Sequence, residues 1–180
     1  MLDQLQNMRR LALGQLELPS QRFFTPTDAF WHFIGIHHQK VELIECGSGT
    51  GYVLEEAARR GLRLRGVDLA SRLGQSSIVE KLDATQLPWS PTCWPIICRP
   101  DHSGWATEVL RKARASHASG WYVGLSRNYT RDLEGLRTQR QVGTFGEDGE
   151  KLYWIPPPVI QKQPTRRNRT RKTSLAGADQ

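Results

Sequence analysis

Short apolar runs alternate with longer amphipathic stretches through most of this chain from residue 41 onward. The stretches at 52–60 and 103–116 place their apolar residues on one side of a helix, and Ser103 is expected to cap the second helix. The apolar runs have the length of strands and lie at 41–46, 63–68, 77–82, 93–98 and 120–125. Strands that alternate with helices in this way predict an α/β fold with a mainly parallel sheet.

Two further strands are expected at the end of this region. Residues 140–145 and 151–155 flank the sequence GEDG, a turn-rich spacer that is too short for a crossover helix. They are therefore expected to form an antiparallel hairpin, preceded by a short helix at 130–136. With the hairpin, the predicted sheet has seven strands and its unit covers residues 41–158.

The segment ahead of the sheet, residues 1–40, has a helical pattern. Leucine and methionine recur at helical spacing through residues 2–18, and a second helix is expected over 26–33, starting at Pro26 after a Thr25 cap. We interpret this segment as a helical lead-in or lid. The alternative is a helix that only covers one face of the sheet.

The positive charge of the chain is concentrated at one end. The chain has 180 residues and a formal net charge of +7, and residues 159–180 hold six Lys and Arg against one acidic residue, a net +5. That tail has almost no apolar content, so we expect it to be disordered. It is a candidate for nucleic-acid contact, with a solubilising role as the alternative. The remaining residues carry only +2.

The cysteines and the apolar runs indicate a compartment. The chain has three cysteines, which form no CxxC pair, so neither a zinc site nor a disulfide framework is expected. No apolar run approaches the roughly 18 residues of a membrane span, and the first ten residues lack the apolar core of a signal peptide. These features predict a soluble protein of the reducing cytoplasm.

The most informative segment is ECGSGTG at 45–51, which directly follows an apolar strand and directly precedes a helix. Glycines at such a place let the backbone turn sharply and approach a ligand closely. The next strand ends in an acidic residue, Asp68, which lies 17 positions beyond Gly51. A carboxylate there can accept hydrogen bonds from both hydroxyls of a ribose held over the glycines.

The spacing of the glycines distinguishes between nucleotides. A dinucleotide fingerprint needs a third glycine at position 52, which is Tyr52, so a nicotinamide dinucleotide is a minor alternative. The G-x-G-x-G run preceded by Glu45, together with Asp68 and Asp83, resembles the class I S-adenosylmethionine-dependent methyltransferases over about residues 41–155. The resemblance implies a Rossmann-like, doubly wound sheet that ends in an antiparallel hairpin.

The resemblance also implies a function and a set of cofactor contacts. It implies transfer of a methyl group from S-adenosylmethionine to an acceptor that the sequence does not identify, either a small molecule or a nucleic acid. In the family the glycine run lies under the methionyl part and the sugar, the first acidic residue holds the ribose, and the second meets the adenine. The matching positions here are Glu45, Cys46, Gly47, Gly49, Gly51, Asp68, Leu69, Asp83 and Ala84. Thr25 is added because Phe23-Phe24-Thr25-Pro26 resembles a cofactor-contacting segment of some adenine-modifying members.

The acceptor side departs from the family. Amino-directed nucleic-acid methyltransferases carry Asp or Asn, two prolines and an aromatic residue after the fourth strand, whereas this chain has CRPDHSGW at 98–105. Asp101 or His102 can remove a proton from the acceptor, and Arg99 can hold an anionic group of the cofactor or the acceptor. The alternative for Asp101 and His102 is a helix cap with loop hydrogen bonds.

The missing motif leaves a second hypothesis open, in which the chain binds the cofactor without catalysis and serves as a regulatory or scaffold module. With no inserted substrate domain, selectivity would come from residues 1–40, the 99–105 loop or a partner chain, which includes a second copy. Trp31 and Trp105 are candidates for acceptor contact, while the other tryptophans are expected in the core. Asn128 and Tyr129 are expected to form a turn or the rim of the acceptor site. The His37-His38 pair is expected on the surface.

Overall fold

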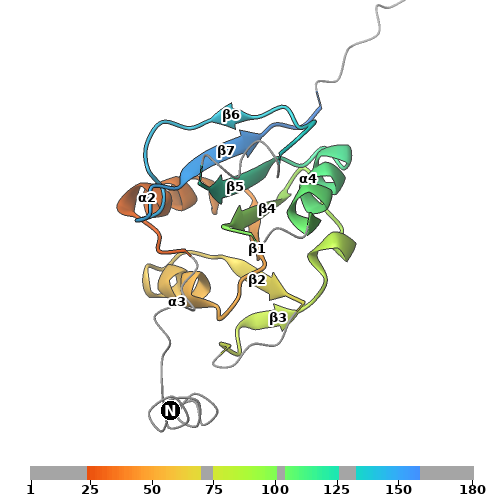
Figure 1. The fold of residues 1–180 in the computed structure, drawn as a ribbon. Coiled ribbons are helices and arrows are strands. Elements are labelled where there is room, and N and C mark those ends of the chain that lie inside the picture. The colour runs from red at the N-terminus through yellow and green to blue at the C-terminus, as the bar shows by residue number, and fades with distance from the viewer. Residues whose placement is uncertain (1–23, 70–74, 101–103, 126–132, 159–180) are drawn as a thin grey trace, which may run out of the picture.

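A single twisted sheet organises the molecule (Figure 1). The computed structural model describes residues 24–69, 75–100, 104–125 and 133–158. The seven strands lie in the order β3-β2-β1-β4-β5-β7-β6. Their bounds are β1 Glu42–Cys46, β2 Arg65–Asp68, β3 Val79–Lys81, β4 Cys93–Cys98, β5 Gly120–Gly124, β6 Gln139–Arg140 and β7 Lys151–Ile155.

The strand pairings confirm the predicted mainly parallel sheet. β1 pairs in parallel with both β2 and β4, and β2–β3 and β4–β5 are also parallel pairs. β7 pairs antiparallel with β5 on one side and with β6 on the other, so the hairpin places its second strand inside the sheet. The first hairpin strand, β6, is shorter than the predicted 140–145.

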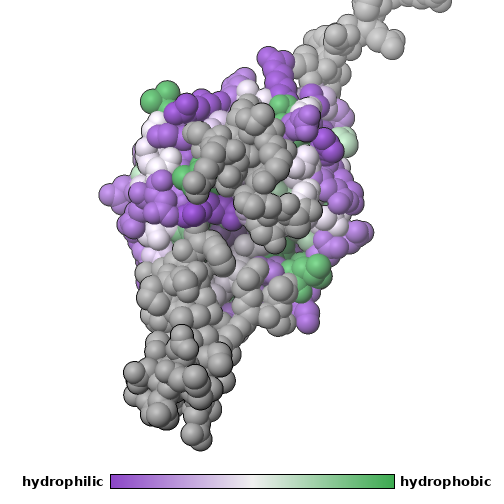
Figure 2. Space-filling model, viewed as in Figure 1, coloured by the Kyte–Doolittle hydropathy of each residue, from purple (hydrophilic) through white to green (hydrophobic). Residues whose placement is uncertain are grey.

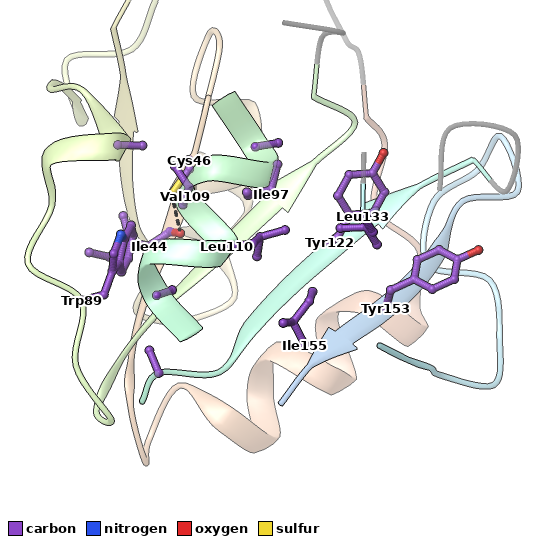
Figure 3. Packing of buried hydrophobic residues seen from close by; sticks show 14 of the residues in the cluster. Ile44, Cys46, Trp89, Ile97, Val109, Leu110, Tyr122, Leu133, Tyr153 and Ile155 are labelled. Carbon is purple, nitrogen blue, oxygen red and sulfur yellow. Dashed lines mark hydrogen bonds between the residues drawn. The ribbon is translucent and has the colours of Figure 1, made fainter. Parts of the chain in front are cut away.

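Helices cover both faces of the sheet, as an α/β fold requires. α2 (Asp28–His37) and α3 (Tyr52–Arg59) pack on one face, and α4 (Trp105–Ala115) with the 3-10 helix η2 (Ala84–Gln86) packs on the other (Figure 1). Each layer has its own apolar core. The core under α4, drawn in Figure 3, includes Ile44, Ile97, Val109, Leu110 and Tyr122.

The core under α2 and α3 is rich in aromatic side chains. Trp121 contacts Phe33, His37 and Trp94 edge to face, with ring centroids 4.5 to 5.5 Å apart. His37 is therefore not the exposed surface residue that the sequence suggested. Its partial burial and the nearby Lys40 ammonium lower the pKa of its imidazole.

Two helix starts differ from the prediction. α2 begins at Asp28 rather than Pro26, because Pro26 forms a β-bridge with Gly146 and the cap position falls on Thr27. The cap residue of α4 is Gly104, which has a left-handed backbone and no side-chain cap bond, so the expected Ser103 cap is wrong. The predicted helix over 2–18, residues 130–132 and the tail lie outside the described residues. The described part of the predicted helix over 130–136 is wrong, because residues 133–136 form a turn closed by the bond from the Leu136 N–H to the Leu133 carbonyl.

The described surface carries few large apolar side chains. On the face shown in Figure 2, the coloured atoms are mostly hydrophilic and the hydrophobic ones form small separate spots. In the part of the chain that the structure describes, no helix is long and apolar enough to cross a membrane.

Candidate functional site

The predicted cofactor residues lie at the carboxyl ends of the parallel strands. The ECGSGTG segment follows β1, and Asp68 and Leu69 end and follow the neighbouring β2. From β1 the chain continues through α3 to β2, which lies on one side of β1, whereas β4 pairs with β1 on its other side. The order of strands therefore reverses at β1. In open α/β sheets, ligands bind outside the carboxyl ends at such a reversal.

The turn itself depends on glycine. Gly47, Gly49 and Gly51 have φ values of 75°, 58° and 88°, a region that side chains disfavour. A Cβ on Gly51 would lie 2.7 Å from Val79 Cγ2, whereas a Cβ on Gly49 would meet no atom within 4 Å. The turn is thus tightly packed at Gly51 and open at Gly49. This open side gives a ligand access to the backbone.

Asp68 is bound to the turn rather than separate from it. Its carboxylate is buried and accepts a hydrogen bond of 2.8 Å from the backbone N–H of Gly49. The opposite side of the turn is held by Gln75, whose side-chain amide donates to the Gly49 carbonyl at 2.9 Å, and by the Ser76 N–H, which donates to the Thr50 carbonyl. These bonds fix the position of a carboxylate beside an open backbone.

Glu45 lies behind the turn in a site with little access to water. Its side chain is only 3% exposed, and its Oε2 atom has no hydrogen-bond partner among the described residues. Burial raises the pKa of this carboxyl to about 8, although the nearby Ser48 hydroxyl, which donates to the Glu45 backbone carbonyl at 2.8 Å, and the Cys98 thiol favour the ionised form. The Asp68 carboxylate adds to the increase. Glu45 is therefore largely uncharged at neutral pH.

The other predicted adenine contacts lie along the β2–β3 edge of the site. Leu69, next to the buried Asp68, is 65% exposed. Asp83 caps η2, because its Oδ1 accepts bonds from the N–H and hydroxyl of Thr85 at 2.8 and 2.7 Å. These bonds, the hydroxyl bond first, lower the pKa of the Asp83 carboxyl. Ala84 is buried at the start of η2.

Arg99 belongs to an ion cluster on the β4–β7 side of the same edge. Its Nη1 donates to Asp148 and, at 3.1 Å, to Glu150, a carboxylate whose side chain is 1% exposed. The backbone of Arg99 has φ 45°, and its N–H donates to the Val123 carbonyl of β5. The predicted anion-holding group is therefore occupied by two carboxylates of this chain.

Thr25 lies next to that cluster. The segment 25–27 runs along the β6–β7 connection: the Thr25 carbonyl accepts from the Glu147 N–H, and the Thr27 N–H donates to the Phe145 carbonyl. Thr25 thus lies at the correct edge of the sheet. The backbone bond of Thr25 is structural, and its contact with a cofactor stays a prediction.

Trp105, the first residue of α4, packs against the glycine turn. The position of a Cβ on Gly47 would lie 2.8 Å from Trp105 Cη2, so the indole and the turn are in direct contact. Trp31, by contrast, is buried in the core against Phe30, with the Arg60 guanidinium 4.9 Å above its ring. This placement corrects the prediction that Trp31 contacts the acceptor.

Several predicted acceptor residues cannot be placed. Asp101, His102, Asn128 and Tyr129 lie outside the described residues. Sequence reasoning missed Glu150, which is fully buried and whose Oε2 has no hydrogen-bond partner among the described residues. Its surroundings in the sequence, GEDGEK at 146–151, are typical of an exposed turn and gave no signal of burial.

Comparisons with known proteins support the fold. No family model matches the chain, and no curated protein matches its sequence. Among solved structures, a 23S rRNA methyltransferase, ErmE, superposes with a TM-score of 0.52 at 10% identity, over 76% of this chain and 70% of that one. The chain therefore has the Rossmann-like fold of class I S-adenosylmethionine-dependent methyltransferases.

Two further structures are similar at lower scores. A precorrin-6y C5,15-methyltransferase from Geobacter metallireducens gives a TM-score of 0.48 at 9% identity, over 74% of this chain and 93% of that chain. A 1,6-didemethyltoxoflavin-N1-methyltransferase from Burkholderia thailandensis, solved with S-adenosylhomocysteine, gives 0.43 at 10% identity, over 73% and 78%.

Proposed function

We propose that this protein is a methyltransferase that uses S-adenosylmethionine as its methyl donor. The observation that supports it best is the bond between the Asp68 carboxylate and the Gly49 N–H, which fixes an acidic group beside an open glycine backbone at the reversal of strand order. The site also suits the charge of the donor. The glycine segment itself contains no lysine or arginine, and Glu45 lies behind it with an unpartnered oxygen.

Each described residue has a role that follows from its position. The space at the Gly49 Cα accommodates the methionyl part and the sugar, Asp68 accepts bonds from the ribose hydroxyls, and Leu69 provides an apolar wall for the adenine. Asp83 accepts a bond from the adenine amino group through Oδ2, since Oδ1 is used by Thr85. The cofactor supplies a methyl group on a sulfonium, which transfers by in-line displacement once the acceptor is positioned.

Isothermal titration with S-adenosylmethionine and S-adenosylhomocysteine tests the cofactor site. We expect wild-type protein to bind both, and Asp68→Ala to weaken binding at least about tenfold, which corresponds to the loss of one hydrogen bond to a charged group. Asp28→Ala, an exposed aspartate in the first turn of α2, is the matched control and should bind as wild type does. Absent binding, or equal binding by both variants, would contradict the proposal.

The acceptor side supports a second candidate function, a module that binds the cofactor without transferring its methyl group. The observation that favours it is the occupation of Arg99 by Asp148 and Glu150 at the end of β4, where the family places its acceptor motif. Incubation with methyl-labelled cofactor and a panel of RNA, DNA, protein and small-molecule acceptors distinguishes the two functions. Label in any acceptor establishes transfer, while binding without label supports the silent module.

We assign Asp101 or His102 as the base on the acceptor side of this proposal, and the cationic tail at 159–180 as a contact for a nucleic-acid partner. Both assignments rest on the sequence alone. The acceptor panel includes RNA and DNA for this reason, with a copy of the protein lacking 159–180 run in parallel.

A further inference from the structure

We infer that Glu45 makes the glycine turn selective for a cationic ligand, because it is uncharged in the free protein and ionises when S-adenosylmethionine binds. The inference rests on the proposed function. It assigns to one buried residue the discrimination between the donor, which carries a sulfonium, and the demethylated product, which is a neutral thioether at the same position.

The first step is the surroundings of the Glu45 carboxyl. It sits at the carboxyl end of β1, and the groups that act on it come from the three elements at that end. They are the Ser48 hydroxyl of the turn, the Cys98 thiol of β4 and the Asp68 carboxylate of β2. The neighbouring Cys46 and Cys98 thiols are themselves buried, and burial raises the pKa of each.

The second step is that these groups supply no positive charge. Two carboxyl groups, a hydroxyl and thiols face one another, and Glu45 Oε2 has no partner among the described residues. Arg99, the cation nearest in sequence to Cys98, donates to Asp148 and Glu150 instead. No described Lys or Arg contacts this carboxyl, and a buried carboxylate without a cation is unfavourable, so the free protein keeps a proton on Glu45.

The third step is the effect of the ligand. S-adenosylmethionine carries a sulfonium, an ammonium and a carboxylate, so it brings one net positive charge to the open side of the turn. In a site of low dielectric that charge favours the ionised form of Glu45, and the proton leaves to solvent. S-adenosylhomocysteine has the same ammonium and carboxylate but no sulfonium. It therefore binds with Glu45 still protonated.

The direction of the pH dependence follows. Below a pH of about 8, binding of the donor includes release of a proton from Glu45, so donor affinity rises with pH up to that point. Product affinity is independent of this group. The ratio of donor to product affinity therefore increases as the pH rises from 6.5 to 8.5. At neutral pH, methyl transfer removes the sulfonium and so lowers the affinity of the site for the product that remains bound.

Isothermal titration in two buffers of different ionisation enthalpy, phosphate and Tris, measures the protons directly. At pH 7.0 we expect S-adenosylmethionine to release most of one proton more than S-adenosylhomocysteine does. Sinefungin, which carries an amine in place of the sulfonium methyl, should behave as the donor. Between pH 6.5 and 7.5 the donor-to-product affinity ratio should rise by several-fold, up to about tenfold.

Glu45→Gln tests the residue, and Glu42→Gln is the matched control on the same strand, exposed at its opposite end. Glu45→Gln should abolish the extra proton release and make the affinity ratio independent of pH, while Glu42→Gln should match wild type. Equal proton release for donor and product, or an unchanged pH dependence in Glu45→Gln, would overturn the inference and leave the proposed function standing. Failure of folded wild-type protein to bind either ligand would overturn both.

Discussion

At the residue scale, the site combines two carboxylates with different environments. Asp68 accepts a hydrogen bond from a backbone N–H of the turn that it faces, whereas one oxygen of Glu45 is buried with no hydrogen-bond partner in the described part of the chain. The two are adjacent in the sheet, because β1 and β2 are neighbouring strands. Asp68 is therefore suited to accept hydrogen bonds from neutral hydroxyls, whereas the ionisation of Glu45 responds to a nearby charge.

The buried Glu45 also makes the free protein sensitive to pH. Its folded-state pKa, about 8, lies above the ordinary value of 4.5, so the folded state binds more protons than the unfolded state between those values. The free energy of unfolding should therefore fall as the pH rises through this window, by up to about 1.4 kcal/mol per pH unit. Urea unfolding at pH 5.5, 6.5 and 7.5 measures the slope.

Glu45→Gln supplies the comparison for that slope. The amide does not titrate, so the fall in unfolding free energy between pH 5.5 and 7.5 should be reduced in this variant. A slope equal to that of wild type would contradict the assignment of this pH dependence to Glu45. His37, whose pKa is lowered, cannot produce the fall, because it makes the folded protein more stable as the pH rises.

At the scale of elements, the packing of α3 on the sheet requires a small residue in β2. A Cβ at Gly66 would collide with Leu54 Cδ1 of α3 and lie 2.5 Å from the Ser48 hydroxyl of the turn. The backbone of Gly66 has ordinary strand geometry, so the requirement comes from space alone. The glycine in β2 thus sets how closely the helix that follows the turn approaches the sheet.

Alanine substitutions at two glycines test this packing. Gly66→Ala should destabilise the fold by about 1–3 kcal/mol through overpacking against α3. Gly35→Ala should stabilise it by about 0.5–1 kcal/mol, because Gly35 lies within α2 and its Cβ would meet only Leu62, at 4.0 Å. Thermal and urea unfolding of both variants measure whether each substitution raises or lowers the free energy of unfolding. Destabilisation by Gly35→Ala would contradict the packing of α2 described above.

The sequence predicted which helices and strands form better than it predicted the residues at which they begin and end. Apolar runs located all five parallel strands. The signal is clearest for β1, β4 and β5, which are largely buried, whereas β3 is mostly exposed. Tertiary contacts decided the rest. Pro26 was expected to start a helix, but it pairs with Gly146, a residue far along the chain. Tertiary contacts also decided part of the site. The spacing of the glycines identified Asp68 from the sequence, whereas the ion pair of Arg99 and Glu150 depends on the pairing of β7 with β5, which the sequence does not show.

At the scale of the whole molecule, charge is divided between the folded region and the tail. The tail at 159–180 carries +5 of the net +7, so it dominates any attraction to a polyanion. Deleting these residues should remove salt-dependent binding to RNA or DNA and leave the cofactor affinity unchanged. Fluorescence anisotropy with a labelled oligonucleotide measures this binding at 50 and 200 mM salt. Between these two concentrations the affinity should fall roughly a hundredfold or more. Equal binding by both forms would refute a role for the tail.

The position of β7 has a consequence for how the molecule assembles. β7 is the last strand in the chain, yet it lies between β5 and β6, and the connection that leads into it also binds the segment at 25–27. A chain that ends before residue 150 therefore leaves the β7 edge of β5 unpaired and Arg99 without Glu150. The bonds between 25–27 and 145–147 span most of the described chain, and long-range contacts of this kind slow folding.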